Sequence, residues 1–312
     1  MYTIHEAANA FLFHCQHEKK LSPKTLKAYA IDCEQFLSFL GKARIKQQVD
    51  GIDKYVLKEY LQHLNNRKPK TLKRKIATIK AMFNFLEFED EILVNPFRKM
   101  KIQIKEPKML PSVMSLNEVE KILCEAVKQL KNISRKGSYQ YLEKLRHLVV
   151  LETLFATGMR VSEMCYLKVE DIDLDSGTIK IMGKGSRQRI IQICHTDVLR
   201  ILRSYHHKAQ KRSKTIGYFF LNRRGERLSD QSVRFMIEKY ALNAGIQKRI
   251  TPHTFRHSFA TLLLEQNVDI KYIQNLLGHS SISTTQIYTH VNSGKQREIL
   301  LRQHPRKFIH AN

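Results

Sequence analysis

The stretch from residue 251 to 291 constrains the fold of this chain more than any other part. It begins with Thr251 followed by Pro252, which are favoured residues at the N-cap and the first position of an α-helix. Apolar residues continue at helical spacing, and a second helix is predicted at about residues 270–277, ending at Gly278. The N-terminus of the first helix is therefore a potential anion site, because its backbone N–H groups and its dipole favour negative charge.

Side chains suited to phosphate chemistry occur in this stretch at short, ordered spacings. His253 and Arg256 are three positions apart, so they share a face at the start of the first helix. Arginine adds a planar fork of donors that is always charged. His279 follows the second helix directly, and Tyr288 lies nine positions later in a predicted short helix. These four residues are candidates for one phosphate site.

A further candidate residue for the phosphate site, Arg160, lies upstream. Residues 145–167, which contain it, read LRHLVVLETLFATGMRVSEMCYL. A buried helix is predicted to end near Gly158, and Arg160 is predicted to start another helix. Glu163 is the expected partner of Arg160, because a buried arginine needs one. Taken alone, this pattern would indicate an arginine in a connection between two helices.

One clear β pattern interrupts the helices. Residues 178–182 and 189–193 are predicted to be two strands, joined by a glycine-rich turn that contains Lys184. Arg187 and Arg189 lie close to Lys184 and are alternatives to it for any role on this hairpin. The predicted fold class is mainly α with a small β-sheet.

Residues 1–100 are predicted to be helical throughout and to form a four-helix bundle. The predicted helices begin after a capping box at Thr3, at Ser22-Pro23, near Asp53 and at about Pro69. The second of these is expected to end at Gly41. We predict three parts of the chain: an N-terminal helical domain (1–100), a basic linker (101–114) and a second domain with a C-terminal tail (115–312). The polar segment 131–144 is expected to be a loop insertion without an assigned role.

The charge and the cysteines limit the class of protein. The 312 residues include 54 Lys and Arg against 29 Asp and Glu, and a formal charge of +25 implies a polyanionic partner. Binding to a ribosome or to a membrane surface would also fit the charge alone. The five cysteines are scattered, and His206 and His207 lack a metal-ligand pattern, so we predict no metal site.

No apolar run approaches the ~20 residues of a membrane span, and no signal peptide or nucleotide-binding motif is seen. We expect a soluble cytoplasmic protein without a cofactor.

In their order and spacing, these motifs resemble the tyrosine recombinase (phage integrase-like) family. ATGMRVSEM around Arg160 resembles the family's first box, and H-x-x-R at His253–Arg256 resembles its second. LLGHSS and T-x-x-x-Y-x-H follow, and they contain His279 and Tyr288. SPKTLKAY (22–29) and NPF (95–97) are similar to the family's N-terminal core-binding domain. A lone H-x-x-R has no specificity, but the ordered set is highly specific.

The resemblance implies a fold, an activity and partners. The fold would be a SAM-like helical bundle and a catalytic domain that together form a C-shaped clamp on DNA. The activity would be site-specific recombination through a 3′-phosphotyrosine intermediate, without metal or ATP. The partners would be double-stranded DNA with specific sites and further recombinase subunits, either in a homotetramer or as a paired recombinase. Integration, excision, inversion and dimer resolution all fit the same residues.

The resemblance also implies a role for each site residue. Tyr288 would be the nucleophile, and Arg160 and Arg256 would hold the phosphate oxygens. Lys184 would be the general acid toward the leaving oxygen. His253 would assist proton transfer at Tyr288. His279 would donate a hydrogen bond to the phosphate, and many relatives carry tryptophan at this or the neighbouring position.

Other basic residues are candidates for contacts with the DNA backbone. They lie in the segment RKPKTLKRK (67–75), which carries six positive charges and no negative one, on the hairpin, and between residues 223 and 234. A solvated basic surface is the alternative for each of them. The candidates are Lys70, Lys73, Arg74, Lys75, Arg187, Arg223, Arg224 and Arg234.

Two other functions stay open at this point: strand relaxation like that of a type IB topoisomerase, and DNA binding without catalysis. In relatives the C-terminal segment docks on a neighbouring subunit. Ile299, Leu300 and Leu301 form an apolar patch in the basic tail of this chain and are candidates for such docking.

Overall fold

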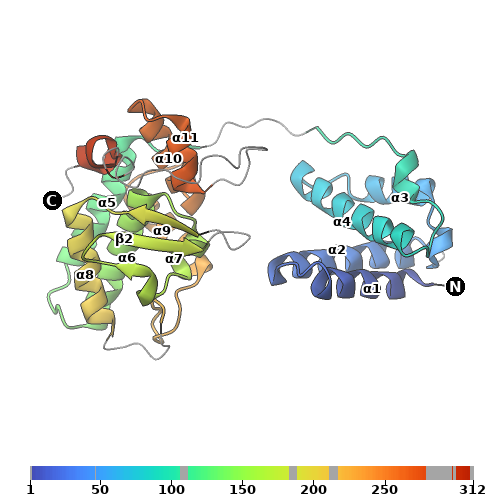
Figure 1. Ribbon diagram of the computed structural model, residues 1–312, viewed down its shortest axis with the longest axis horizontal. Helices are drawn as coiled ribbons and strands as arrows, with labels where there is room; N and C mark the ends of the chain where they lie inside the picture. The colour runs from blue at the N-terminus through green and yellow to red at the C-terminus, as the bar shows by residue number, and fades with distance from the viewer. Residues whose placement is uncertain are drawn as a thin grey trace. The chain divides into compact units, whose positions relative to one another are not determined.

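The computed structural model describes residues 2–45, 47–105, 112–182, 188–210, 217–278, 297 and 300–309. The chain divides into two compact units, Met1–Met109 and Leu110–Asn312, each with its own core. Helices dominate both units, and the one sheet of the described residues is small (Figure 1). The predicted fold class, mainly α with a small β-sheet, is confirmed.

The N-terminal unit is a bundle whose helices begin where the capping residues predict. Thr3 forms a capping box, Ser22 accepts a hydrogen bond from the amide of Thr25, and Asp53 accepts two from the first turn of its helix. The second helix runs through Gly41, which was wrongly predicted to end it. The elements are α1 (Ile4–His17), α2 (Pro23–Lys42), η1 (Val49–Gly51), α3 (Lys54–His63), α4 (Pro69–Phe88) and η2 (Pro96–Lys99).

A buried polar network joins α4 to α2. Asp32 is fully buried and accepts hydrogen bonds from Lys75 Nζ (2.9 Å), Thr78 Oγ1 (3.0 Å) and the guanidinium of Arg74. Lys75 is 4 % exposed, so its prediction as a member of the exposed basic face is wrong. The reason is helical phase, because residue 75 lies on the same face as the buried Ile79.

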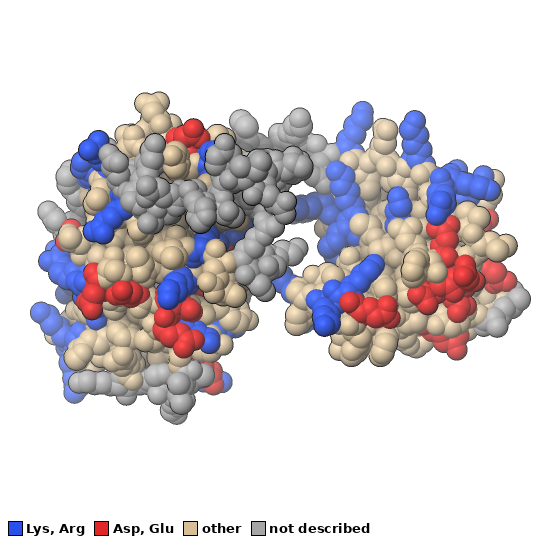
Figure 2. Space-filling view, in the orientation of Figure 1, with Lys and Arg blue, Asp and Glu red and all other residues tan. Residues whose placement is uncertain are grey.

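The exposed basic face of α4 therefore contains Lys70, Lys73 and Arg74 but not Lys75. Figure 2 shows Lys and Arg gathered on the side of the N-terminal unit where α4 lies. Arg74 belongs to both the buried network and the exposed face, because it pairs with Asp32 while its side chain stays 43 % exposed.

The C-terminal unit is built around one central helix, α6 (Tyr139–Thr157). Its residues from 148 to 157 are all buried, because α5, α8, α9 and α10 pack around it (Figure 1). The other helices are α5 (Leu116–Lys131), α7 (Val161–Cys165), η3 (Val169–Asp171), α8 (Thr196–Gln210), α9 (Asp230–Asn243), α10 (Pro252–Glu265), α11 (Ile270–Leu277) and η4 (Pro305–Phe308).

The polar segment 131–144 is not the single loop that was predicted. Helix α5 ends at Lys131, and α6 already begins at Tyr139, where Ser138 caps it. Only the residues between the two helices form a connection. Serine at the N-cap was the available signal for this helix start.

The sheet is antiparallel, with the order β1 (Ile172–Asp173), β2 (Thr178–Met182) and β3 (Gln188–Gln192). Ile179 faces Ile191 across the β2–β3 pair, and both are buried against the core. The two predicted strands are confirmed, although β3 begins one residue earlier than expected. The tip of the hairpin, residues 183–187, lies outside the described residues, and so do Lys184 and Arg187.

The C-terminal segment 300–309 packs on helices of its own unit. Leu300 is buried with Phe259 and Leu277, whereas Leu301 is half exposed. Arg306 forms a buried, bidentate ion pair with Glu152 of α6, with Nε–Oε2 at 2.7 Å and Nη2–Oε1 at 2.8 Å. Docking of this segment on a neighbouring subunit stays a prediction.

The described part of the chain has no helix long and apolar enough to cross a membrane. Within the same residues, no three His, Cys, Asp or Glu side chains are grouped so that they could hold a metal ion.

Candidate active site

The first half of the site is set by a sharp turn at the end of α6. Gly158 ends the helix in the left-handed conformation, with φ of 60°. A Cβ at this position would lie 2.5 Å from Phe259 Cδ1 and 2.9 Å from Leu277 Cδ2, so only glycine fits. The turn places Arg160 at the N-cap of α7, beside the end of α11.

Arg160 is held by a carboxylate and a carbonyl. Its Nη1 donates to Glu163 Oε1 at 2.7 Å, and its Nη2 donates to the carbonyl oxygen of Gly278 at 3.1 Å. The predicted Arg160–Glu163 pair is therefore confirmed. The side chain of Arg160 is still 36 % exposed, whereas that of Glu163 is only 8 % exposed. Arg160 is thus positioned by the protein and remains accessible to a ligand.

Arg256 reaches the same place from α10, where Thr251 forms the predicted N-cap. It is buried, and its Nη1 and Nη2 donate to the carbonyl oxygens of Gly158 (2.8 Å) and Leu277 (2.6 Å). Burial and the nearby Arg160 lower the pKa of Arg256 to about 10, so it is charged at neutral pH. The guanidinium groups of Arg160 and Arg256 therefore converge on the turn at residues 277–278.

His253 is exposed in the first turn of α10. Partial burial lowers its pKa, and the neighbouring His257, Arg256, Arg234 and Arg160 lower it further. Because a lowered pKa favours the uncharged ring, His253 is neutral at pH 7 and can accept a proton.

Arg189, on β3, is a member of this cluster that we considered only as an alternative to Lys184. Its Nη1 and Nη2 donate to Glu163 Oε1 (2.9 Å) and Oε2 (2.6 Å). Burial alone would raise the pKa of Glu163, but the hydrogen bonds from Arg189 and Arg160 outweigh burial and lower it. The only sequence signal was that Arg189 lies on the predicted hairpin.

The structure thus brings together Arg160, His253 and Arg256 from two separate elements, the start of α7 and the first turn of α10. The other predicted catalytic residues, Lys184, His279 and Tyr288, lie outside the described residues. Described residues next to Lys184 and His279 nevertheless show where the chain leads toward them. Strands β2 and β3 lead to the hairpin that carries Lys184, and Gly278 directly precedes His279 at the point where the arginines meet.

The predicted DNA-binding arginines that the structure describes in this unit, Arg223, Arg224 and Arg234, occupy two places. Arg234 is exposed on α9 and lies close enough to His253 to affect its pKa. Arg223 and Arg224 are exposed in a turn and line a different cavity of about 520 Å³, where the Arg223 guanidinium lies over the ring of Tyr139 at 5.9 Å.

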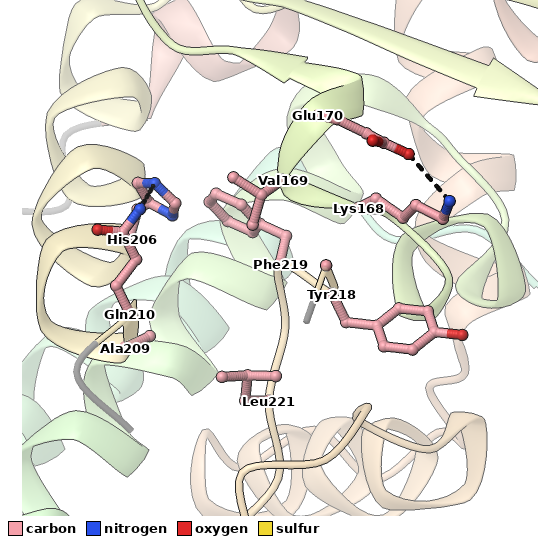
Figure 3. A pocket seen from close by; sticks show the side chains of 10 residues that line it. Lys168, Val169, Glu170, His206, Ala209, Gln210, Tyr218, Phe219 and Leu221 are labelled. Carbon is pink, nitrogen blue, oxygen red and sulfur yellow. Dashed lines mark hydrogen bonds and ion pairs between the residues drawn. The ribbon is translucent and has the colours of Figure 1, made fainter. Parts of the chain in front are cut away.

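A further cavity of about 590 Å³ is lined by none of the predicted catalytic residues that the structure describes, Arg160, His253 and Arg256 (Figure 3). In its wall, the ring of His206 stacks on Phe219 at 5.3 Å, and His206 Nε2 accepts a hydrogen bond from Gln210 Nε2 at 2.6 Å. An ion pair between Lys168 and Glu170 forms another part of the wall. His206 therefore has local packing partners.

The sequence of this chain is similar to those of known proteins. Residues 114–295 match the phage integrase family, and residues 8–90 match the phage integrase N-terminal SAM-like domain. A tyrosine recombinase of Agathobacter rectalis is 45 % identical over 99 % of this chain and 100 % of its own length. Tyrosine recombinase XerD of Staphylococcus saprophyticus is 38 % identical over 95 % of this chain and 97 % of its own length.

Solved structures show the same fold. XerH site-specific recombinase bound to its difH substrate has a TM-score of 0.69 at 24 % identity, covering 92 % of this chain and 83 % of that one. A lambda integrase dimer bound to a core site has a TM-score of 0.66 at 19 % identity, covering 92 % of this chain and all of that one. The sequence matches show that the chain belongs to the phage integrase family and is a tyrosine recombinase.

Proposed function

We propose that this site-specific tyrosine recombinase cleaves and rejoins DNA through a covalent bond between Tyr288 and the 3′ phosphate. The observation that supports this most strongly is the convergence of Arg160 and Arg256 on the turn at residues 277–278. Both guanidinium groups are fixed by protein oxygens before any ligand binds. Preorganised donors of this kind stabilise the charge that develops on phosphoryl oxygens during displacement.

The proposed cleavage is an in-line displacement at phosphorus. The phenol oxygen of Tyr288 forms a bond to the phosphorus atom while the bond to the 5′ oxygen breaks. His253, neutral at pH 7, assists removal of the phenol proton, and Lys184 gives a proton to the leaving 5′ oxygen. His279 donates a hydrogen bond to the phosphate.

Rejoining is the same step in reverse. A 5′ hydroxyl of the original or of a different strand attacks the phosphotyrosine, and Tyr288 leaves. Because the covalent intermediate conserves the energy of the phosphodiester bond, the cycle is balanced without a nucleotide cofactor. Attack by a different strand gives recombination.

We propose double-stranded DNA with specific recombination sites as the substrate, and a homotetramer or a paired recombinase as the active assembly. The charge of +25 and the exposed basic face of α4 support binding to DNA. Among the solved relatives are a lambda integrase dimer bound to a core site and a tetramer bound to a Holliday junction. Because the substrate is DNA, we propose that the protein works in the cytoplasm.

The 45 % identity to a tyrosine recombinase over the whole chain favours recombination over topoisomerase-like relaxation. A binder without catalysis would lack the covalent intermediate, so that intermediate is the property to measure.

The test is covalent trapping on DNA. Labelled genomic fragments of the source organism, each carrying random nicks, would be incubated with wild-type protein and with Tyr288→Phe, and then separated on denaturing gels. We expect a covalent protein–DNA band for the wild type only, with equal binding of both proteins in native gels. A band that persists in Tyr288→Phe would exclude Tyr288 as the nucleophile, and intact binding without any band would favour the non-catalytic alternative.

A further inference from the structure

We propose that Arg189 is a positioning residue, which occupies the carboxylate of Glu163 so that Arg160 stays available to the DNA phosphate. This inference rests on the proposed function, because it concerns how one phosphate-binding arginine of that site is held.

Glu163 is shared between two arginines from different elements. Arg189 approaches from β3 with both terminal nitrogens, at 2.9 Å and 2.6 Å from the two carboxylate oxygens. Arg160 contributes its backbone N–H (2.8 Å to Oε2) and a single side-chain nitrogen, Nη1 (2.7 Å to Oε1). Each oxygen of Glu163 therefore accepts two hydrogen bonds, which uses its acceptor capacity.

This division of the carboxylate controls what Arg160 can do. Two nitrogens of one guanidinium bind a free carboxylate side by side, which is the strongest arrangement for such a pair. Because Arg189 already holds both oxygens in that way, Arg160 reaches Glu163 through one terminal nitrogen only. Without Arg189, we expect Arg160 to rotate into the bidentate arrangement and to withdraw donors from the phosphate.

The charges lead to the same conclusion. Arg160, Arg256 and Arg189 carry three positive charges against the single negative charge of Glu163, so the cluster is positive by two. Without Arg189 the excess falls to one. The phosphoryl oxygens gain negative charge on the way to the transition state, and the loss of a nearby fixed positive charge would therefore slow the reaction.

Arg189 also contacts the turn to which Arg160 is bound. A Cβ on Gly278 would lie 2.8 Å from Arg189 Nη1 and 3.1 Å from its Cζ, and Gly278 has φ of 62°. The guanidinium thus packs directly against this glycine, whose carbonyl oxygen accepts from Arg160. The side chain of Arg189 is only 13 % exposed, so Arg189 acts through its neighbours and is not itself placed at the surface.

The rival explanation is that Arg189 simply fastens β3 to α7. The two explanations predict different results with chemically altered DNA. A methylphosphonate at the scissile position removes one negative charge and therefore needs less help from arginine. A 5′-thiol leaving group needs no general acid, so it relieves defects in proton donation from the hairpin.

The experiment measures single-turnover cleavage by wild type, Arg189→Met and Arg189→Lys on saturating nicked DNA. Arg200→Met is the matched control, since Arg200 is 78 % exposed on α8 and pairs only with Asp197 in the described residues. We expect Arg189→Met to cleave roughly 10- to 100-fold more slowly, by analogy with the loss of a residue that orients a metal ligand. DNA affinity should be unchanged, Arg189→Lys should be intermediate because it keeps the charge without the fork, and Arg200→Met should match the wild type.

On methylphosphonate DNA the defect of Arg189→Met should shrink, and on 5′-thiol DNA it should persist. The proposal is overturned if Arg189→Met cleaves at the wild-type rate. It is also overturned if only the thiol substrate reduces the rate defect relative to wild type, or if that defect is the same on all three substrates. If Arg189→Met does not fold, the same comparisons are made with Arg189→Lys and decide in the same way.

A crystal structure of the free Arg189→Met protein, or of Arg189→Lys, provides a readout that does not depend on cleavage. Both terminal nitrogens of Arg160 on Glu163 would support the proposal, and an unmoved Arg160 would contradict it. A wild-type protein without any covalent product would refute the proposed function, whereas an active wild type with an unaffected Arg189→Met would refute only this inference.

Discussion

His253 and Arg256 lie within one turn of α10, yet the protein uses them differently. Arg256 points into the unit, and two of its five N–H donors bind carbonyl oxygens at helix ends. His253 is exposed, and partial burial together with its positive neighbours lowers its pKa, which favours the uncharged ring. The same helix start thus supplies one fixed cation and one proton acceptor.

The lowered pKa of His253 predicts the pH dependence of cleavage. Its protonated form cannot accept the phenol proton, so the rate should fall as the pH decreases through the folded pKa, which lies below the ordinary value of 6.5. Between pH 7 and 8 this group should have no effect. Rate–pH profiles of wild type and His253→Gln check this, and we expect the variant to be about 10²-fold slower or worse and to lack the acid limb. An acid limb that persists in His253→Gln would assign it to another group.

The sequence allowed correct predictions where partners are close in the chain. Arg160 and Glu163 are three residues apart at a helix start, and their pairing follows from that spacing. Arg189 is different, because only the register of β3 against β2 brings it to Glu163. Nothing in the spacing distinguishes Arg189 from its basic neighbours on the hairpin.

At the level of elements, α4 shows what a count of charges misses. Its first two turns carry four basic residues, but Lys75 faces α2 and pairs with Asp32, while Lys70 and Lys73 are exposed. Helix starts were predicted well because serine, threonine and aspartate caps act locally. The inward lysine was missed because its acid partner is 43 residues away.

Two substitutions in α4 should separate these roles. Lys75→Met leaves buried Asp32 with fewer donors, and we expect it to destabilise the N-terminal unit by roughly 1.5–3 kcal/mol. Lys70→Ala should change stability by less than about 0.5 kcal/mol, yet lower the slope of log binding constant against log salt concentration by about 1. Urea unfolding and DNA titrations at several salt concentrations measure both effects. A Lys70→Ala protein with an unchanged salt slope would remove Lys70 from the DNA-binding surface.

For the whole molecule, the main feature is that the two units share no core residue among those described. One apolar cluster lies within residues 4–97, and two others lie beyond residue 113. The second unit is closed by a long-range contact, since Arg306 and Glu152 are 154 residues apart. No local pattern indicated this pair, and the tail was expected only to bind a neighbour.

Arg306→Met should therefore affect one unit only. It leaves Glu152 buried without its partner, and such a loss costs about 3–5 kcal/mol. We expect hydrogen exchange to speed up at α6 and to stay unchanged at α4. The double variant Glu152→Leu/Arg306→Met removes both charges and should recover most of the lost protection. If α4 and α6 lost protection together, the two units would not be independent in stability.

The ion pair of Arg306 with Glu152 also sets an order of events during protein synthesis. The α6 helix leaves the ribosome long before residue 306 is made, and until then Glu152 has no partner within its growing domain. The described buried core of the N-terminal unit ends at position 97, so this unit can fold earlier during translation. We therefore expect the C-terminal unit to complete its fold only after residue 306 is made, so that a nascent chain already holding the basic helix α4 does not yet cut DNA.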